Sequence, residues 1–267
     1  MKERLDVLLV KRGFFPDKEK AQRAIMAGLV IVDEKKIDKS GTMIKLDKEP
    51  NIRIKGDSLK YVSRGGLKLE KAVSVFEMDF NGKKVLDVGA STGGFTDCAL
   101  QNGAEFVYSV DVGTNQLDWK LRNNPQVKSI ENMHIKDLTL DDIDGNLVDY
   151  IVMDVSFISI KKIIGDLVKF FKPETKLMAL IKPQFEVDKE HIAKGGIVKD
   201  SRVHEEVIQR VVEKFSDEGF KVIDITYSPI KGGQGNIEFL AYIQREKHDD
   251  KHVVFSKDII HKVVEEA

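Results

Sequence analysis

Cysteine is nearly absent from this sequence of 267 residues, and long hydrophobic runs are absent altogether. The single cysteine, Cys98, cannot form an internal disulfide, which favours a reducing, cytoplasmic location. No apolar run approaches the roughly 18 residues that a membrane-spanning helix needs. The first residues, MKERLDVLLVKR, lack the apolar core of a signal peptide. We therefore expect a cytoplasmic protein without a membrane segment.

Metal-binding patterns are missing as well. No pair of cysteines or histidines has the spacing of a structural or catalytic metal site. The one suggestive run, HDDKH at 248–252, is more typical of a charged connector in solvent. We predict that the protein holds no metal.

What the sequence does have is an uneven distribution of charge. The formal net charge is −1, yet residues 1–60 contain 15 Lys and Arg against 10 Asp and Glu. The remaining residues contain 28 basic and 34 acidic side chains. A basic segment attached to an acidic body favours a polyanionic partner for the basic part. The length allows one large domain and one small domain.

Residues 1–58 have the pattern of a small α+β unit. Three leucines have helical spacing within residues 3–12, and Gly13 ends that run. Asp17 can cap a second helix. Short strands are expected at 29–32, 43–46 and 52–54.

After residue 62, apolar strands alternate with helical segments. Strands are expected at 84–88, 106–110, 127–130, 150–153, 177–181, 222–225 and 237–243. Helices are expected at 65–77, 95–102, 114–121, 159–170, 203–218 and 256–266, the last with Ile259, Ile260, Val263 and Val264 facing inward. This alternation predicts an α/β fold, a doubly wound sheet with helices on both faces. The last two strands are joined only by SPIKGGQGN, so the final strand is expected to run antiparallel.

The run VLDVGASTGGFTD at 85–97 is the clearest functional signal. An apolar strand ends near Asp87 and turns through three glycines before a helix begins. Nucleotide-like cofactors bind at such strand–turn–helix units, at the carboxyl edge of an open α/β sheet. The spacing does not match G-x-G-x-x-G, which argues against a dinucleotide and fits S-adenosylmethionine better. An ordinary tight turn is the structural alternative.

Charged residues follow several of the strands. Asp111 ends the second strand, about 20 residues after the glycine turn, where a carboxylate can accept hydrogen bonds from a ribose. Asp154 ends the fourth strand, Lys182 ends the fifth, and Glu238 begins the last. Because that last strand is expected to be reversed, these three residues should meet at one edge of the sheet. A lysine there could accept or orient a hydroxyl proton during methyl transfer, and an ion-paired strand edge is the structural alternative.

Several of these runs resemble a known family. LDVGASTGGFTD, DVSFIS, LIKPQFE and GNIEFL are similar to the TlyA (haemolysin A) family of rRNA cytidine-2′-O-methyltransferases, which are FtsJ/RrmJ-like enzymes. RLDVLLVKRGF, KAQRAIMAGLVIV and the Gly41-Thr42 turn resemble the RNA-binding domain named after ribosomal small-subunit protein four. The resemblance covers nearly the whole chain. It implies a Rossmann-like S-adenosylmethionine-dependent methyltransferase sheet with an antiparallel last strand, plus a small N-terminal α+β RNA-binding domain.

The resemblance also implies roles for individual residues. The family's Lys-Asp-Lys-Glu tetrad falls on Lys68, Asp154, Lys182 and Glu238, and only the resemblance assigns Lys68. The implied contacts to S-adenosylmethionine are Gly89, Ala90, Ser91, Gly93, Gly94, Phe95, Asp111 and, near the adenine, His134. For His134, a solvent-facing position in a loop is an equal alternative.

The basic N-terminal unit is expected to bind rRNA within ribosomal subunits. Its candidate phosphate contacts, together with Arg64 near the linker, are Arg4, Lys11, Arg12, Lys18, Lys20 and Arg23. Such contacts position an RNA without reading its sequence. We expect a monomer that binds neither DNA nor a membrane.

The expected domain boundaries follow from these assignments. They are an RNA-binding domain at 1–58, a linker at 59–64, an FtsJ-like methyltransferase domain at 65–246, and a tail at 247–267 whose helix packs on the catalytic domain.

Other methyl acceptors fit this sequence less well. Enzymes that methylate exocyclic amines resemble one another in an Asn/Asp-Pro-Pro-aromatic run, whereas Asp154 here precedes Val155-Ser156-Phe157. Carbon-5 methylation resembles a design with a cysteine nucleophile, but Cys98 falls inside a helix and is typical of buried packing. Two other classes stay open: a haemolysin-like membrane-active protein, and an RNA-binding assembly factor without methyl transfer.

Overall fold

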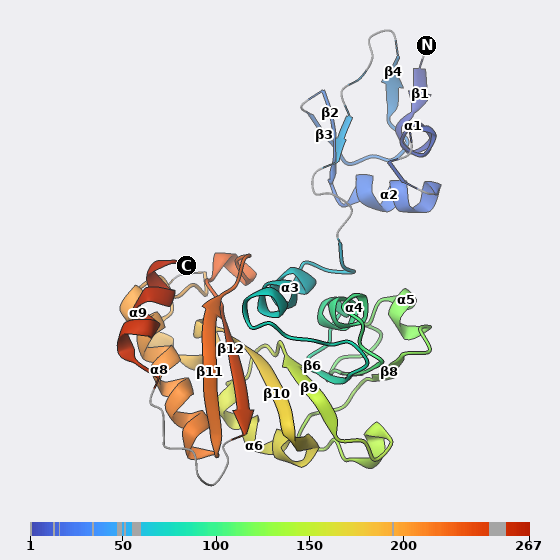
Figure 1. Cartoon of the computed structure of the whole chain (residues 1–267). Helices are drawn as coiled ribbons and strands as arrows, with labels where there is room; N and C mark the ends of the chain where they lie inside the picture. Colours follow the sequence, from blue (N-terminus) through green and yellow to red (C-terminus); the bar gives the residue numbers. More distant parts are fainter. Residues whose placement is uncertain are drawn as a thin grey trace. The chain divides into compact units, whose positions relative to one another are not determined.

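The computed structural model describes residues 2–12, 14–15, 17–33, 35–46, 50, 52–54, 60–193, 195–245 and 255–267. The chain forms two compact units, Met1–Lys60 and Tyr61–Ala267 (Figure 1). Each unit has a hydrophobic core of its own. The expected helix stop at Gly13, the first residue of the expected linker, 59, and the run 248–252 lie outside the described residues.

The described part of the N-terminal unit contains two helices and two small antiparallel sheets. Helices α1 (Leu5–Lys11) and α2 (Lys18–Met26) share one apolar core with the strands. The Asp17 side chain caps α2 by accepting the Lys20 N–H at 2.8 Å, as its position predicts. The strands, paired in the orders β1-β4 and β3-β2-β5, are β1 (Lys2–Arg4), β2 (Val30–Val32), β3 (Lys35–Ile37), β4 (Met43–Lys45) and β5 (Ile52–Ile54).

The first helix is shorter than expected. Residues Lys2–Arg4 pair with β4 as a strand, and α1 begins only at Leu5. Strand β3 was also not anticipated. Both strands are short and mostly polar, so neither shows the apolar alternation that marks a strand in sequence.

The described residues of the C-terminal unit form a seven-stranded sheet in the order β11-β12-β10-β9-β6-β7-β8 (Figure 1). Its strands are β6 (Lys84–Val88), β7 (Phe106–Val110), β8 (Val127–Ile130), β9 (Val148–Met153), β10 (Phe171–Ile181), β11 (Phe220–Tyr227) and β12 (Phe239–Arg245). Strands β6 to β10 are parallel to one another, whereas β12 is antiparallel to both β10 and β11. The predicted α/β fold with a reversed last strand is therefore confirmed.

Helices pack on both faces of this sheet, because successive residues of a strand point to opposite faces. Leu86 and Met153 belong to the core that includes residues of α6, α8 and α9, whereas Val85 and Val152 belong to the core of α3 and α4. The helices are α3 (Gly65–Val75), α4 (Gly94–Gln101), α5 (Trp119–Arg122), α6 (Ile164–Leu167), α7 (Pro183–Glu186), α8 (Ser201–Asp217) and α9 (Lys257–Glu265). Short 3₁₀ turns lie at Asp141–Ile143, Ile160–Lys162, Val168–Phe170, Lys189–His191 and Gly233–Gly235.

Two expected helices differ from the structure. The helix expected at 114–121 begins only at Trp119, because Glu131 accepts the backbone N–H groups of Asn115 and Gln116 and holds that segment in a turn. The segment expected at 159–170 is divided into α6 and two 3₁₀ turns.

The C-terminal helix α9 packs on α8 and β11. Ile260 and Val264 are buried there, but Ile259, expected to face inward, is 46% exposed. On a surface helix, the residues that face the core are three or four positions apart. Two adjacent isoleucines point in different directions, so only one of them reaches the core.

Candidate active site

The loop after β6 requires glycine at two positions. Gly89 has a φ of +83°, and a Cβ atom there would lie 2.6 Å from the Asp154 carbonyl oxygen. Gly93 has a φ of +94°, and a Cβ atom there would lie 2.3 Å from Leu121 Cδ1. Only glycine combines a positive φ with so close an approach of neighbouring atoms. The backbone path of the loop therefore requires glycine at both positions.

Asp87, the next-to-last residue of β6, is fully buried. Its Oδ2 accepts a hydrogen bond from Thr96 Oγ1 at 2.6 Å, and the same hydroxyl lies 2.7 Å from Ser109 Oγ. Burial, with the Thr96 hydroxyl acting against it, raises the pKa of Asp87 to about 7. The three side chains connect β6, α4 and β7 through one polar network.

Asp111, directly after β7, connects to the glycine loop. Its Oδ2 accepts the Ser91 N–H at 2.8 Å, and its Oδ1 accepts the Gly113 N–H at 2.7 Å. Each carboxylate oxygen can accept a second hydrogen bond, so both oxygens retain capacity for the hydroxyls of a ribose.

A cavity of about 340 Å³ lies beside the loop. Val112, Met133 and Ile135 give it apolar walls, and Asp111 and His134 are among its polar lining. His134 is half-buried, and its Nδ1 accepts the Lys136 N–H at 3.2 Å.

These residues fit S-adenosylmethionine. Apolar walls suit an adenine, and the remaining lone pairs of Asp111 suit a ribose. Of the expected cofactor residues, those that line this cavity are Gly89, Ser91, Asp111 and His134. A second, neighbouring cavity has a volume of about 370 Å³, and the expected cofactor residues that line it are Gly89, Ala90, Ser91, Gly94 and Phe95. Gly93 instead packs on Leu117 and Leu121.

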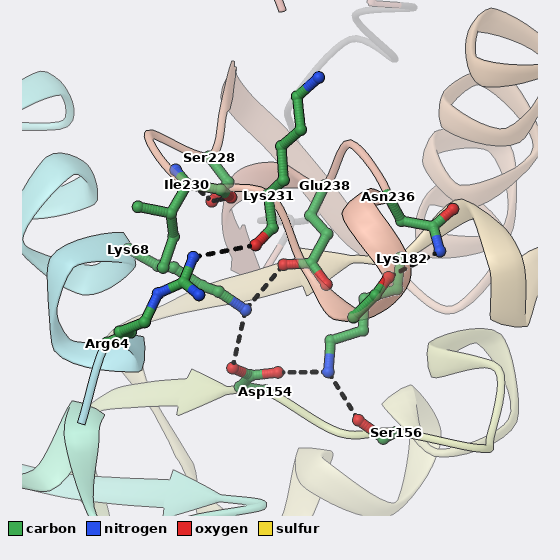
Figure 2. A network of polar contacts seen from close by, with 11 residues as sticks. Arg64, Lys68, Asp154, Ser156, Lys182, Ser228, Ile230, Lys231, Asn236 and Glu238 are labelled. Atoms are coloured by element: carbon green, nitrogen blue, oxygen red, sulfur yellow. Dashed lines mark hydrogen bonds and ion pairs between the residues drawn. The ribbon is translucent and has the colours of Figure 1, made fainter. Parts of the chain in front are cut away.

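Four ionisable side chains from distant parts of the chain meet at the second cavity (Figure 2). Three of them line it, and the fourth, Glu238, contacts Lys68 behind them. Lys68 lies on α3, Asp154 follows β9, Lys182 follows β10, and Glu238 precedes β12. Lys182 Nζ lies 2.6 Å from Asp154 Oδ1. Lys68 Nζ lies 3.4 Å from Asp154 Oδ2 and 2.7 Å from Glu238 Oε2. Asp154 is thus the carboxylate that both lysines share.

These four side chains are largely removed from water. Their exposed fractions are 10% for Lys68, 19% for Asp154, 9% for Lys182 and 2% for Glu238. Buried charges are tolerated when they are paired, and here two formal positive charges balance two negative ones. Lys182 also donates a hydrogen bond to Ser156 Oγ at 2.7 Å. Each ammonium therefore has two oxygen neighbours among the described residues, which leaves one of its three donors for a substrate.

The reversal of β12 produces this arrangement. Ile181 at the carboxyl end of β10 pairs with Phe239 at the start of β12. Glu238 therefore lies next to the strand end that carries Lys182. If the last strand were parallel to β10, Glu238 would lie at the amino-terminal end of the neighbouring strands, away from Lys182.

Glu186, at the end of α7, has a role that the sequence pattern did not reveal. Its Oε2 accepts the Ser159 hydroxyl at 2.6 Å, and its Oε1 accepts the Ile160 N–H at 2.8 Å. Burial raises the pKa of this carboxyl. The side chain ties the segment that follows Asp154 to the helical turn that follows Lys182. The available signal was its place in the run IKPQFE, directly after the buried strand.

Asn236 was missed in the same way. It is buried and accepts the Val198 N–H at 3.0 Å on its Oδ1. Its Nδ2 donates to the carbonyl oxygens of Gly196 at 2.8 Å and Gly233 at 3.0 Å. It therefore fixes the loop that leads into Glu238.

The candidate RNA contacts of the N-terminal unit differ in their neighbours. Arg4 donates hydrogen bonds of 3.0 and 2.8 Å to the buried Asp6, and this contact holds the pKa of Asp6 well below its usual value. Lys11 pairs with Glu3. Arg23 is exposed and forms no ion pair with the described residues.

The remaining cations have other neighbours. Lys18 lies 4.0 Å from Asp6, and Lys20 lies 3.9 Å from Asp17. Arg12 donates to the Pro50 carbonyl oxygen at 3.1 Å. Arg64 belongs to the C-terminal unit and lines the second cavity.

Two findings bear on other classes of function. None of the helices in the described part of the chain is long and apolar enough to span a membrane. Across the same residues, no three His, Cys, Asp or Glu side chains form a group that could hold a metal ion.

Comparison with known families gives two matches. A family model described as FtsJ-like methyltransferase matches residues 61–245. A model of the S4 domain matches residues 3–49.

Individual relatives extend over the whole chain. A protein of Bacillus subtilis named putative rRNA methyltransferase YqxC is 46% identical over 266 residues, covering 100% of this chain and 94% of its own. The 16S/23S rRNA (cytidine-2'-O)-methyltransferase TlyA of Mycobacterium tuberculosis is 33% identical and covers 99% of this chain and 98% of its own. A solved structure described as a putative hemolysin from Streptococcus thermophilus has a TM-score of 0.76 and 45% identity, covering 99% of this chain and 95% of its own.

Proposed function

This chain belongs to the FtsJ-like methyltransferase family, and on that premise we propose that it methylates a ribose 2′-hydroxyl of rRNA, with cytidine as the acceptor nucleoside. It is an enzyme of the methyltransferase class, and S-adenosylmethionine is its methyl donor. The observation that carries the proposal is the meeting of Lys68, Asp154, Lys182 and Glu238 beside the glycine loop.

A ribose hydroxyl has to be oriented, and its proton has to leave as the new bond forms. Bound S-adenosylmethionine supplies an electrophilic methyl group. Lys182 is assigned either as an ammonium that orients the hydroxyl or, once it has given up one of its own protons to solvent, as the amine that accepts the hydroxyl proton. Asp154, 2.6 Å away, is its electrostatic partner. Lys68, held between Asp154 and Glu238, positions the hydroxyl. Holding the acceptor in line with the donor supplies a further part of the rate.

The cofactor is assigned to the first cavity and its boundary with the second. Asp111 would accept hydrogen bonds from the ribose of the cofactor, and His134 would lie near its adenine. The backbone of the loop from Gly89 to Phe95 would hold the amino-acid end. This assignment is supported by the apolar walls of the first cavity and by the unused lone pairs of Asp111.

The N-terminal unit is assigned to RNA binding, because its S4 match and basic composition point to the same partner. We place the substrate in ribosomal subunits, and therefore in the cytoplasm. The candidate phosphate contacts that stay proposed are Lys11, Arg12, Lys18, Lys20, Arg23 and Arg64. The Arg4 guanidinium is instead engaged by the buried Asp6.

The experiment that tests the proposal is incubation with tritiated S-adenosylmethionine and separated ribosomal subunits. The labelled rRNA is digested to nucleosides, and the modified nucleotide is mapped. We expect the label in 2′-O-methylcytidine at a defined position. Label on a base, or cofactor binding without transfer to either subunit, contradicts the proposal.

The same protein preparation tests the membrane-active alternative. Rupture of erythrocytes that is unchanged by Lys182→Ala would favour that alternative. We expect no rupture from either protein.

A further inference from the structure

Two exposed cations lie at the second cavity without an acidic partner. Arg64, at the N-terminus of α3, and Lys231, in the loop between β11 and β12, both line the second cavity, beside three members of the tetrad. Neither side chain forms an ion pair with the described residues. Figure 2 shows Arg64 beside Lys68, and the Lys231 side chain extending away from the tetrad.

The charge of this cavity is not balanced by the protein. Lys68 and Lys182 are matched by Asp154 and Glu238. Arg64 and Lys231 add two further positive charges. A cavity of this kind concentrates positive potential at its opening and favours an anionic ligand there.

The loop that carries Lys231 is held in place on both sides. The Arg64 guanidinium donates to the Lys231 carbonyl oxygen at 3.4 Å. The Ser228 hydroxyl donates to the Ile230 carbonyl oxygen at 2.6 Å, and the Gly232 N–H donates to the Asn236 carbonyl oxygen at 2.8 Å. The position of Lys231 relative to the tetrad is therefore set by backbone contacts.

Gly232 shows how close this loop lies to the catalytic carboxylate. A Cβ atom at residue 232 would lie 2.0 Å from Glu238 Oε1. Any other residue at this position would have to displace Glu238, which is 2.7 Å from Lys68. Lys231 directly precedes Gly232, so its backbone lies next to the residue that borders Glu238.

Ribose chemistry identifies the anion. The 2′-hydroxyl is on the carbon next to the one that carries the 3′-phosphodiester, so a 2′-hydroxyl at Lys182 brings that phosphate to the opening of the same cavity. Building on the proposed function, we propose that Arg64 and Lys231 bind the phosphodiester on the 3′ side of the acceptor nucleotide. Arg64 offers a planar pair of donors, and Lys231 a mobile point charge.

The test compares Lys231→Met with the wild-type enzyme on ribosomal subunits, at about 50 mM and about 200 mM KCl, a range over which phosphate contacts lose strength. We expect kcat/KM for subunits to fall about tenfold at low salt, as for the loss of one charge-assisted phosphate contact. The ratio of wild type to variant should shrink at high salt. Lys231→Arg should restore kcat/KM, and the Kd for S-adenosylmethionine should not change in either variant.

Lys262→Met is the matched control. Lys262 is exposed on α9 and forms no ion pair with the described residues. We expect its kcat/KM to equal that of the wild type at both salt concentrations.

The outcomes separate this proposal from the proposed function. A ratio that stays the same at both salt concentrations would indicate a structural role for Lys231 and overturn the phosphate site. An unchanged kcat/KM in Lys231→Met would overturn it as well. If the wild type labels a base and not a ribose, the proposed function fails, while a salt-dependent ratio would still place an anionic group of the RNA beside Lys231.

Discussion

The two units of this protein hold their charged side chains in opposite ways. The C-terminal unit buries Lys68, Lys182 and Glu238 at 10% exposure or less and pairs them with one another through Asp154. The N-terminal unit exposes most of its cations and buries a carboxylate, Asp6, against Arg4. Buried pairs fix positions, whereas exposed cations offer attraction that salt can screen.

We therefore expect the buried side chains to determine the geometry of the active site, and the exposed cations to contribute to the affinity for RNA. Removing one member of a buried network changes the positions and charges of the others, so large and specific effects are expected in the C-terminal unit. Removing one exposed cation from the N-terminal unit leaves the others in place, so small and additive effects are expected there.

The largest effect is expected from Lys182→Ala. The substitution removes the group that we propose to accept or orient the hydroxyl proton, a loss that typically costs about 10²–10⁴ in rate. We expect methyl transfer to fall to the background of the assay, while binding of S-adenosylmethionine, measured by calorimetry, stays largely intact. The cofactor assignment rests on the first cavity, in which Lys182 takes no part.

Ser156→Ala is the matched control, because it removes only the hydroxyl that accepts the Lys182 hydrogen bond. A loss smaller than that of Lys182→Ala is expected. Retained turnover in Lys182→Ala would refute the assignment of Lys182.

The next effect concerns the stability of the C-terminal unit as a function of pH. The pKa of Asp87 is raised to about 7 in the folded state from an ordinary value of 3.8, so the folded state keeps a proton that the unfolded state has lost between these values. Stability should therefore fall as the pH rises from about 4 to about 7. The full shift corresponds to about 4 kcal/mol, at about 1.4 kcal/mol for each pKa unit.

Asp87→Asn tests this expectation. Urea unfolding followed by circular dichroism should show a weaker pH dependence in the variant than in the wild type over that range. Asp6 in the N-terminal unit has a lowered pKa, so its contribution has the opposite sign and is lost as the pH falls. Equal pH dependence in Asp87→Asn and wild type would show that Asp87 is not the responsible group.

A smaller effect on rate is expected from Glu186→Ala. The variant loses the contacts to the Ser159 hydroxyl and the Ile160 N–H, and with them the tie between the segments after Asp154 and Lys182. A misplacement of catalytic groups by about 1 Å can cost about 10²-fold in kcat. Single-turnover transfer to subunits measures the loss.

Glu186→Gln separates positioning from loss of folding. Its carbonyl can accept the Ile160 N–H, and its amide can donate to the Ser159 hydroxyl, so most of the activity should return. A defect in Glu186→Gln as large as in Glu186→Ala would instead indicate that the charge of Glu186 matters.

The sheet was predictable because its central strands are buried apolar runs. Strands β6, β7 and β8 have the bounds that the sequence indicates. Strand β10 begins at Phe171 and not at 177, because its first half, FKPET, carries a proline and charged residues and lacks an apolar pattern.

In the candidate site, only the residues at strand ends could be predicted from the order and direction of the strands. Asp154, Lys182 and Glu238 end or begin strands, so the reversal of one strand is enough to bring them together. Lys68 is a helical lysine with no such marker, and only the family resemblance singled it out. Glu186 and Lys231 depend on the paths of loops, which hydrophobic periodicity does not encode.

The smallest effect is expected in the N-terminal unit, where Arg23 and Arg4 form a matched pair. Arg23 is exposed without an ion pair in the described region, whereas Arg4 is engaged by the buried Asp6. Arg23→Ala should weaken subunit binding a few-fold and lower the salt dependence of binding by about one phosphate contact, with an unchanged Tm. Arg4→Ala should lower the Tm, because it leaves the Asp6 carboxylate buried with fewer partners. Filter binding and calorimetry on the two variants measure both quantities. If Arg4→Ala weakens subunit binding while its Tm stays that of the wild type, Arg4 is a phosphate contact, and the contrast between a structural and an RNA-facing arginine in this unit is wrong.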